Sequence, residues 1–205
     1  MLLFNFTPFP ILTTERLILR RPVSNDLPEF FKMRTDEQVM KYVGRPRPHS
    51  PEELKPLFEK METGINENTD IAWVIALKST GEFLGSIGFW RNDPENFRGE
   101  IGYMLQSEYF GKGYATEALH AALNYGFSEM KLNTVLAITD PENTFSQKIL
   151  LKAGFLKEGH IREDFFFEGK FYDSAMYGLL RKDYKLIATE LLSLKIKPSV
   201  RIFAP

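Results

Sequence analysis

The 205-residue sequence contains no cysteine. This absence excludes disulfides, thiolate metal ligands and a cysteine nucleophile, and it fits a reducing compartment, so we expect a cytoplasmic protein. The sequence also has no run of the roughly 18 apolar residues that a membrane span needs. Residues 1–12 are apolar, but they lack a basic segment and carry Pro8 and Pro10, unlike a signal peptide. We therefore expect no membrane partner.

An excess of charge of either sign is also absent. With 26 basic and 27 acidic residues the net charge is −1, which gives no overall field that would attract nucleic acid. His49, His120 and His160 lie far apart without the spacing of metal ligands. We expect neither a nucleic-acid partner nor a bound metal.

Internal repeats, low-complexity tracts and Gly/Ser linkers are missing as well. The apolar share of 43% and the aromatic share of 14% are ample for one packed core. The sequence thus predicts an apolar N-terminal leader over residues 1–12, one domain over residues 13–184 and a C-terminal extension over residues 185–205. The leader packs on the domain or on a partner, so both a monomer and a homodimer are consistent with the sequence.

Apolar periodicity, caps and turn residues predict eleven elements in the order β-α-α-β-β-β-α-β-α-β-β. This order is typical of the α/β class, with a mixed sheet carrying helices on its faces. Ser50, with Pro51 and Glu53 after it, predicts a capped helix that runs to about Gly64. The strands are expected at about 15–21, 71–77, 83–90, 98–106, 134–139, 155–167 and 170–180, and the other helices after 24–26 and at about 113–130 and 143–153.

The segment Glu100–Leu119 is the most informative part of the sequence. It runs from an apolar strand through a turn with Gly111 and Gly113 into an amphipathic helix. The first N–H groups of a helix lack partners within the helix and carry partial positive charge, so a phosphate binds there readily. The glycines let the backbone adopt positive φ and approach a ligand closely.

Three other interpretations of this turn are weaker. An ordinary β-to-α turn needs no ligand at all. A Walker phosphate loop requires Gly-Lys-Ser/Thr after a longer glycine loop, which is absent. A dinucleotide-binding turn would have glycine where Thr116 stands, and the strands form no simple parallel repeat.

Four segments, taken in order, resemble the GNAT family of N-acetyltransferases. The first two are Thr14–Arg20 and Glu100–Tyr103. The third, Phe110–Ala115, resembles the acyl-CoA-binding turn Gln/Arg-x-x-Gly-x-Gly/Ala, with Phe110 in place of Gln or Arg. The fourth, Asp140–Phe155, resembles the family's Asn-x-x-Ser/Ala helix and Gly-Phe stop. The likeness covers about residues 13–184 and is greatest to the branch that acetylates ribosomal-protein N-termini.

The resemblance implies a mixed, mostly antiparallel seven-stranded sheet in which the fourth and fifth strands splay apart. It also implies that acetyl-CoA is the co-substrate, with its pantetheine arm in that splay hydrogen-bonded to the main chain near Met104 and Leu105. The residues carried over as cofactor-binding are Met104, Leu105, Gln106, Gly111, Lys112, Gly113, Tyr114, Ala115, Thr116, Asn143 and Ser146.

Direct acetyl transfer needs a neutral amine, donors to the thioester and a proton for the departing thiolate. The resemblance assigns Asn143 and Ser146 to the reactive end of CoA. It places Leu150 where many members hold a tyrosine acid, so Ser146 is the leading candidate for the group that hydrogen-bonds the sulfur. The alternative is that Asn143 and Ser146 only cap their helix.

Glu100 occupies the position of the general base in another branch of the family, and a buried carboxylate there could deprotonate an ammonium through water. The alternative is a structural carboxylate paired with Arg98 or Arg20. Glu163 and Asp164 are further candidates for binding a cationic amine, or else charges on an edge strand. The acceptor stays open between a protein N-terminus, a polyamine, an aminoglycoside and an amino acid, and an acyl-CoA-binding module without catalysis is the alternative function.

Overall fold

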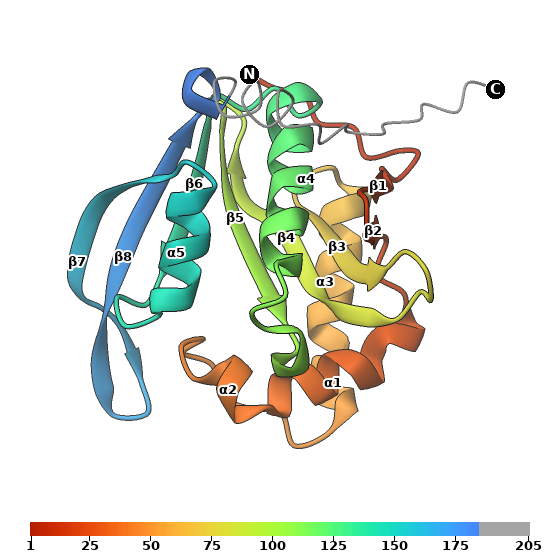
Figure 1. Ribbon diagram of the computed structural model, residues 1–205, viewed down its shortest axis with the longest axis vertical. Helices are drawn as coiled ribbons and strands as arrows, with labels where there is room; N and C mark the ends of the chain where they lie inside the picture. The colour runs from red at the N-terminus through yellow and green to blue at the C-terminus, as the bar shows by residue number, and fades with distance from the viewer. Residues whose placement is uncertain (185–205) are drawn as a thin grey trace.

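The computed structural model describes residues 1–184, which form one sheet of eight strands with helices on both faces (Figure 1). The strand order is β1-β2-β3-β4-β5-β6-β8-β7, and every neighbouring pair is antiparallel except β5 and β6. The elements are β1 (Leu12–Thr13), β2 (Leu17–Arg20), α1 (Leu27–Thr35), α2 (Glu37–Met40), α3 (Lys55–Asn66), β3 (Ile71–Leu77), β4 (Phe83–Asp93), β5 (Arg98–Leu105), α4 (Tyr114–Ser128), β6 (Thr134–Thr139), α5 (Thr144–Lys152), β7 (Leu156–Phe167) and β8 (Lys170–Leu180).

The predicted fold class and its mostly antiparallel sheet are confirmed. The eighth strand is β1, a two-residue strand that pairs with β2 at the edge of the sheet. Helix α2 was also not predicted, because four residues give no periodic pattern. It begins where the side chain of Asp36 accepts hydrogen bonds from the N–H groups of Gln38 and Val39.

The prediction that Ser50 caps a helix was wrong in detail. Residues 51–54 form a 3₁₀ turn, α3 begins only at Lys55, and the Ser50 side chain makes no capping hydrogen bond. Pro56 is the physical reason, because it has no N–H group to continue α-type hydrogen bonding across the junction. The Glu53 carboxylate instead accepts a hydrogen bond from the His49 N–H group.

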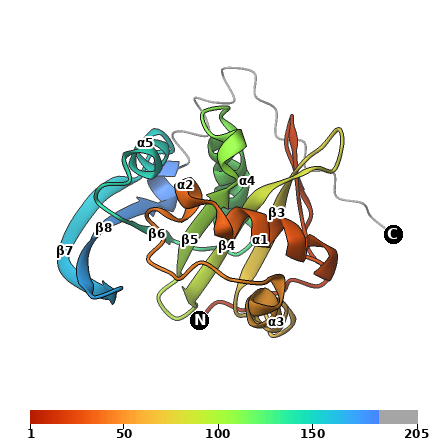
Figure 2. The same ribbon diagram turned by 90° about the horizontal axis from the view of Figure 1, so that it is seen from below.

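Two apolar clusters hold the helices to the sheet. Helices α4 and α5 cover one face, and α1, α2 and α3 lie on the other (Figure 2). Trp73 on β3 is fully buried in the first cluster, and Phe30 on α1 is fully buried in the second. Within residues 1–184, no helix is both long and apolar enough to span a bilayer.

The apolar leader packs on the sheet in this structure. Phe6 is buried in the first cluster, and its N–H group donates to the Asn68 side chain. The Trp73 indole N–H donates to the carbonyl of Pro10 at 2.7 Å. The predicted extension over residues 185–205 lies outside the described part of the chain.

The parallel pair β5 and β6 is joined over a short length only. Its register runs from Arg98 opposite Thr134 to Glu100 opposite Leu136 and then ends. The remaining residues of both strands diverge toward the end of the sheet at which α4 and α5 begin (Figure 1). This is the predicted splay, and it brings the N-termini of both helices to its open end.

Candidate functional site

The turn before α4 allows a ligand to approach the backbone closely. Gly111 has φ +74° and Gly113 has φ +82°. A Cβ at Gly111 would meet nothing within 4 Å, and one at Gly113 would meet only Arg16 Nη2 at 3.4 Å, so conformation rather than space requires glycine at both positions. Gly113 is the N-cap residue and has no side chain to accept from the first-turn N–H groups of α4. These groups therefore remain available to an anion.

A side-chain clamp from the segment before β2 holds this turn, and we call Thr14, Arg16 and Glu117 the Glu117 clamp. The Glu117 carboxylate accepts hydrogen bonds from the Thr14 hydroxyl at 2.6 Å and from the Arg16 N–H group at 2.9 Å. The Arg16 guanidinium lies 2.7 Å from the same carboxylate, donates to the Lys112 carbonyl at 3.1 Å and stacks on the Tyr114 ring. Burial raises the pKa of Glu117, but these hydrogen bonds outweigh it and leave the pKa below its usual value.

The clamp was not predicted, although Thr14 and Arg16 lie in a segment that carried the family resemblance and Glu117 lies within Glu100–Leu119. Phe110, which replaces the polar residue of the motif, is exposed and contributes no polar group. Lys112 is exposed too, and its ammonium lies 5.3 Å from the centre of the Tyr109 ring. Ala115 and Thr116 lie in the first turn of α4, where their N–H groups belong to the uncapped set.

The free edge of β5 presents main-chain groups to the splay. The Gln106 N–H group donates to the Leu84 carbonyl, so the alternation of an antiparallel pair directs the main-chain groups of Met104 toward β4 as well. The same alternation directs those of Tyr103 and Leu105 away from β4, toward the splay. The structure thus favours Leu105 over Met104 for main-chain contacts with a ligand there.

Gln106 is largely occupied within the protein. Its N–H group donates to the Leu84 carbonyl, and its own carbonyl accepts a hydrogen bond from the Tyr109 N–H group at 3.1 Å. Its side-chain amide donates a hydrogen bond to Glu29 at 2.8 Å. Its side chain therefore joins the strand end to α1 rather than pointing to a ligand.

Asn143 and Ser146 begin α5 at the open end of the splay. The Asn143 side chain accepts a hydrogen bond from the Ser146 N–H group at 3.0 Å, which makes Asn143 the helix cap. The Ser146 hydroxyl oxygen lies 3.0 Å from the hydroxyl oxygen of Tyr103 on β5. Leu150 is buried in the core one turn farther on. The capping role of Asn143 is thus present, while the Ser146 hydroxyl faces β5.

Sequence reasoning missed Tyr103 as a site residue. It stands on the part of β5 that pairs with β4 but not with β6. Burial raises its pKa to about 12, although the hydrogen bond with Ser146 acts in the opposite direction. The hydroxyl therefore keeps its proton at neutral pH and can donate it in a hydrogen bond. Its contact with Ser146 of α5 distinguishes Tyr103 from an ordinary tyrosine on an apolar strand, and this contact cannot be seen in the sequence.

Glu100 lies at the last paired position before the splay opens. Its carboxylate accepts two hydrogen bonds from Arg91 at 3.0 and 3.1 Å, and its side chain is 21% exposed. The expected arginine partners are instead engaged elsewhere, because Arg98 pairs with Asp93 and Arg20 with Asp26. The carboxylate therefore remains partly accessible at the apex of the splay.

The candidate site residues of β5 lie on both faces of the sheet. Side chains alternate along a strand, so Glu100 and Met104 share one face while Tyr103 shares the other with Leu105. Met104 packs against the cluster of α1 and α3, whereas Tyr103 packs against the cluster that includes α4 and α5. A ligand bound between α4 and α5 can thus be approached by a second ligand from the far face.

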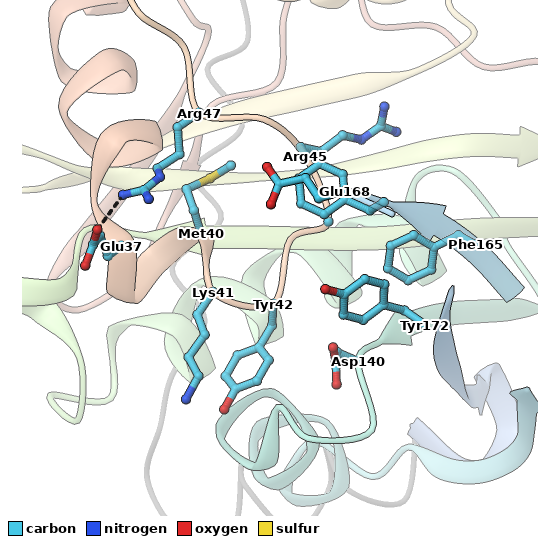
Figure 3. Close-up of a pocket in the computed structure, with 12 residues that line it drawn as sticks. Glu37, Met40, Lys41, Tyr42, Arg45, Arg47, Asp140, Phe165, Glu168 and Tyr172 are labelled. Atoms are coloured by element: carbon cyan, nitrogen blue, oxygen red, sulfur yellow. Dashed lines mark hydrogen bonds and ion pairs between the residues drawn. The ribbon is translucent and has the colours of Figure 1, made fainter. Parts of the chain in front are cut away.

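A cavity of about 230 Å³ lies between the segment of α2 and residues 41–47, the end of β6, and the β7–β8 hairpin. We call it the hairpin cavity; Figure 3 shows the Tyr172 hydroxyl directed into it, with Asp140 below. Gly44 has φ +61°, and a Cβ there would overlap the Phe165 ring at 2.4 Å. The residues that line the hairpin cavity are Glu37, Met40, Lys41, Tyr42, Gly44, Arg45, Arg47, Asp140, Phe165, Phe167, Glu168 and Tyr172.

This cavity could not be predicted from the sequence, because its lining residues come from three distant segments. The lining does not include Glu163 or Asp164, the predicted amine-binding carboxylates. Asp164 instead accepts a hydrogen bond from Ser174 at 2.7 Å within the hairpin.

Residues 16–156 match a family model described as acetyltransferase (GNAT) domain. The chain is 33% identical over 173 residues to the uncharacterized N-acetyltransferase YoaA of Bacillus subtilis (strain 168), covering 84% of this chain and 98% of that one. It is 27% identical over 165 residues to the spermidine N(1)-acetyltransferase of Escherichia coli (strain K12), covering 80% and 86%. The crystal structure of the ribosomal-protein-S5-alanine acetyltransferase from Vibrio fischeri has the same fold, with a TM-score of 0.71 over 85% of this chain and 98% of that chain at 22% identity.

Proposed function

The chain belongs to the GNAT family of N-acetyltransferases, and we propose that it transfers an acetyl group from acetyl-CoA directly to a primary amine while both substrates are bound. The observation that carries the proposal is the β5–β6 splay. Its pairing ends at Glu100, the uncapped N-terminus of α4 lies at its open end, and the Ser146 hydroxyl faces it from α5. No covalent acyl-enzyme is needed for this reaction.

The residues present fit acetyl-CoA on structural grounds. The positive-φ glycines and the free N–H groups at the start of α4 would hold the diphosphate, and the Glu117 clamp would keep the turn in shape. The outward main-chain groups of Tyr103 and Leu105 would pair with the pantetheine amides in the manner of an added strand. Acetyl-CoA supplies an acetyl group activated as a thioester.

In the proposed reaction the amine nitrogen bonds to the acetyl carbon as the carbon–sulfur bond breaks. Tyr103 would donate to the Ser146 oxygen, which leaves the Ser146 hydrogen free to bind the departing sulfur. The proton that the nitrogen loses as the amide forms would pass to this sulfur through the Ser146 hydroxyl, which ends the reaction protonated as it began. Asn143 fixes Ser146 through its cap. Tyr103 thus acts as a positioning residue for Ser146.

An acceptor amine is protonated at neutral pH and must lose a proton to react. Glu100 would accept that proton through water, because its carboxylate lies at the apex of the splay and on the face opposite Ser146. Arg91 holds this carboxylate in place through two hydrogen bonds. The proton taken from the amine and the proton given to the thiolate are thus handled on different faces.

We propose that the acceptor is a protein N-terminal amine that enters through the hairpin cavity. That cavity offers aromatic rings and the Asp140 carboxylate, which suit an ammonium group. The main alternatives are the small amines, a polyamine, an aminoglycoside or an amino acid. The relationship to an enzyme described as acting on spermidine keeps the polyamine among them.

The test measures free CoA released from acetyl-CoA with a panel of peptides and small amines. We expect turnover with at least one peptide N-terminus and strong losses in both S146A and E100Q. Undiminished turnover in both variants would contradict the catalytic assignment. Acetyl-CoA binding without turnover of any amine would instead favour the binding-module alternative.

A further inference from the structure

The segment between β5 and the glycine turn is fastened to α1 and α2. Residues 106–109 form the end of this strand and the 3₁₀ turn that follows it, and we call them the linking segment. The linking segment lies beside α1 and α2 (Figure 1). Three of its side chains make polar contacts with residues of these helices or their caps: Gln106 with Glu29, Ser107 with Asp36 and Glu108 with Lys32.

The three contacts differ in burial and in what they join. Lys32 and Glu108 form an ion pair at 2.7 Å, but their side chains are 62% and 51% exposed, and such pairs contribute little. Gln106 is buried, and its contact fixes the end of β5 to α1. The partly buried contact of Ser107 with Asp36 is the one that reaches the start of α2.

The Asp36 carboxylate uses its two oxygens for two different elements. Oδ2 accepts a hydrogen bond from the Ser107 hydroxyl, while Oδ1 accepts from the N–H groups of Gln38 at 2.7 Å and Val39 at 3.4 Å. The hydrogen bond from Ser107, together with those from Gln38 and Val39, holds the pKa of Asp36 below its usual value, although burial acts in the opposite direction. One ionised carboxylate thus binds the linking segment and caps α2.

Helix α2 depends on this cap because it is only four residues long. A helix of one turn is not stable by itself, so its shape relies on its cap and on its packing. Val39 packs in the second apolar cluster, whereas Glu37 and Met40 line the hairpin cavity. The position of this side of the cavity therefore depends partly on Asp36.

The linking segment lies between the two places at which acetyl-CoA would bind. Leu105, with its outward main-chain groups, precedes the segment, and the positive-φ Gly111 and Gly113 follow it. Tyr109 ties the segment to the start of α4, because its ring centre lies 6.2 Å from that of Tyr114. A cofactor bound before and after the linking segment would restrict its motion.

We propose that Asp36 is a positioning residue that couples the two substrate sites. Acetyl-CoA bound along β5 and at the glycine turn steadies the linking segment, and the contact of Ser107 with Asp36 transmits this order to the α2 side of the hairpin cavity. This inference rests on the proposed function. Such coupling is reciprocal, so an acceptor held in the cavity also favours the binding of acetyl-CoA.

The experiment measures amide hydrogen exchange of the full chain with and without saturating coenzyme A, which is the only ligand added. The reporters are the N–H groups of Met40 and Val43, which donate to the carbonyls of Asp36 and Met40. S107A removes the donor and leaves the Asp36 cap in place. D36S keeps a good capping residue but offers one oxygen in place of two. E108Q is the control, because it breaks the exposed ion pair between the same two parts of the chain.

The measured quantity is the change that coenzyme A causes, since a less stable α2 alone exchanges faster in both states. We expect coenzyme A to slow exchange at the reporters by about tenfold in the wild type and in E108Q. In S107A and D36S the slowing should be largely lost, although coenzyme A still protects residues 113–118.

Two results would overturn the inference. One is unchanged exchange at the reporters in the wild type while residues 113–118 are protected, and the other is equal slowing in the wild type, S107A and D36S. Slowing that requires both Ser107 and Asp36, in a protein that acetylates no amine, would support the inference and contradict the proposed function.

Discussion

The hydroxyl oxygens of Tyr103 and Ser146 lie 3.0 Å apart, although 43 residues separate them in the chain. Tyr103 comes from the part of β5 that is not paired with β6, and Ser146 comes from the first turn of α5 across the splay. The contact joins the two elements that would enclose the thioester. Either hydroxyl can donate in this pair, and the proposed reaction uses the arrangement in which Tyr103 donates.

The hydroxyl pair predicts strongly coupled losses of activity. Y103F and S146A should each lower kcat by about tenfold or more with little change in the KM for acetyl-CoA, because both act on the departing sulfur. The double variant should lose little more than S146A alone. Y177F is the control, since it removes a tyrosine hydrogen bond to Gln147 of the same helix and should leave kcat intact. Additive losses would show that the two hydroxyls act independently.

The raised pKa of Tyr103 predicts a loss of stability in alkali. An unfolded tyrosine titrates near pH 10, whereas Tyr103 in the folded protein titrates at about 12. Between these values the folded state holds a proton that the unfolded state has lost, so the free energy of unfolding falls as pH rises. Urea unfolding at about pH 8 and about pH 11 should show a smaller decrease for Y103F than for the wild type. Equal decreases would indicate that Tyr103 is not protected from titration.

The Glu117 clamp predicts an effect on cofactor binding rather than on chemistry. E117Q weakens charge-assisted hydrogen bonds to Arg16, so the KM for acetyl-CoA should rise by about tenfold while kcat changes little. Steady-state kinetics at saturating acceptor measure both constants. E129Q, at the far end of α4, is the matched control and should leave both unchanged. A fall in kcat alone would place the clamp in the chemical step.

Alanine substitutions at two glycines distinguish a loss of stability caused by backbone strain from a loss of cofactor binding. Gly113 and Gly81 have φ +82° and +76°, and neither has a Cβ position closer than 3.4 Å to a neighbour. G113A and G81A should therefore each cost about 1–2 kcal/mol of stability, measured by urea unfolding. Only G113A should also raise the KM for acetyl-CoA, because Gly81 lies in the β3–β4 turn. An equal rise in both would trace the effect to stability alone.

The proposed role of Glu100 as a base predicts that its substitution causes a pH-dependent loss of activity. E100Q should lower kcat/KM at neutral pH by about tenfold or more, because the acceptor ammonium then lacks its base. The deficit should shrink as pH rises past the pKa of the acceptor, about 8 for an N-terminal amine, since the amine then arrives neutral. The profile of kcat/KM from pH 6 to about pH 10 tests this.

R91Q provides the comparison, because it removes the partner of Glu100 and keeps the carboxylate. It should retain far more activity than E100Q. A constant deficit across the pH range in E100Q, matched by R91Q, would identify Glu100 as a structural carboxylate.

The local sequence was sufficient to predict most of the strands and helices. Strands β3 and β6 have the predicted bounds, and the glycine turn precedes α4 as expected, because hydrophobic periodicity and positive φ act over a few neighbouring residues. Ser50 failed as a cap because the Glu53 N–H group donates to the Ser50 main-chain carbonyl in the 3₁₀ turn and not to its side chain.

The order of the eleven predicted strands and helices, the glycine turn before α4 and the likeness to one enzyme family could all be inferred from the sequence alone. The contacts between distant side chains could be seen only in the folded protein. Thr14 and Glu117 are 103 residues apart, and the hairpin cavity joins residues from three segments. Such contacts depend on how far β5 and β6 diverge and on which face each strand residue occupies. Both are set by the packing of the helices on the sheet, which no short stretch of sequence encodes.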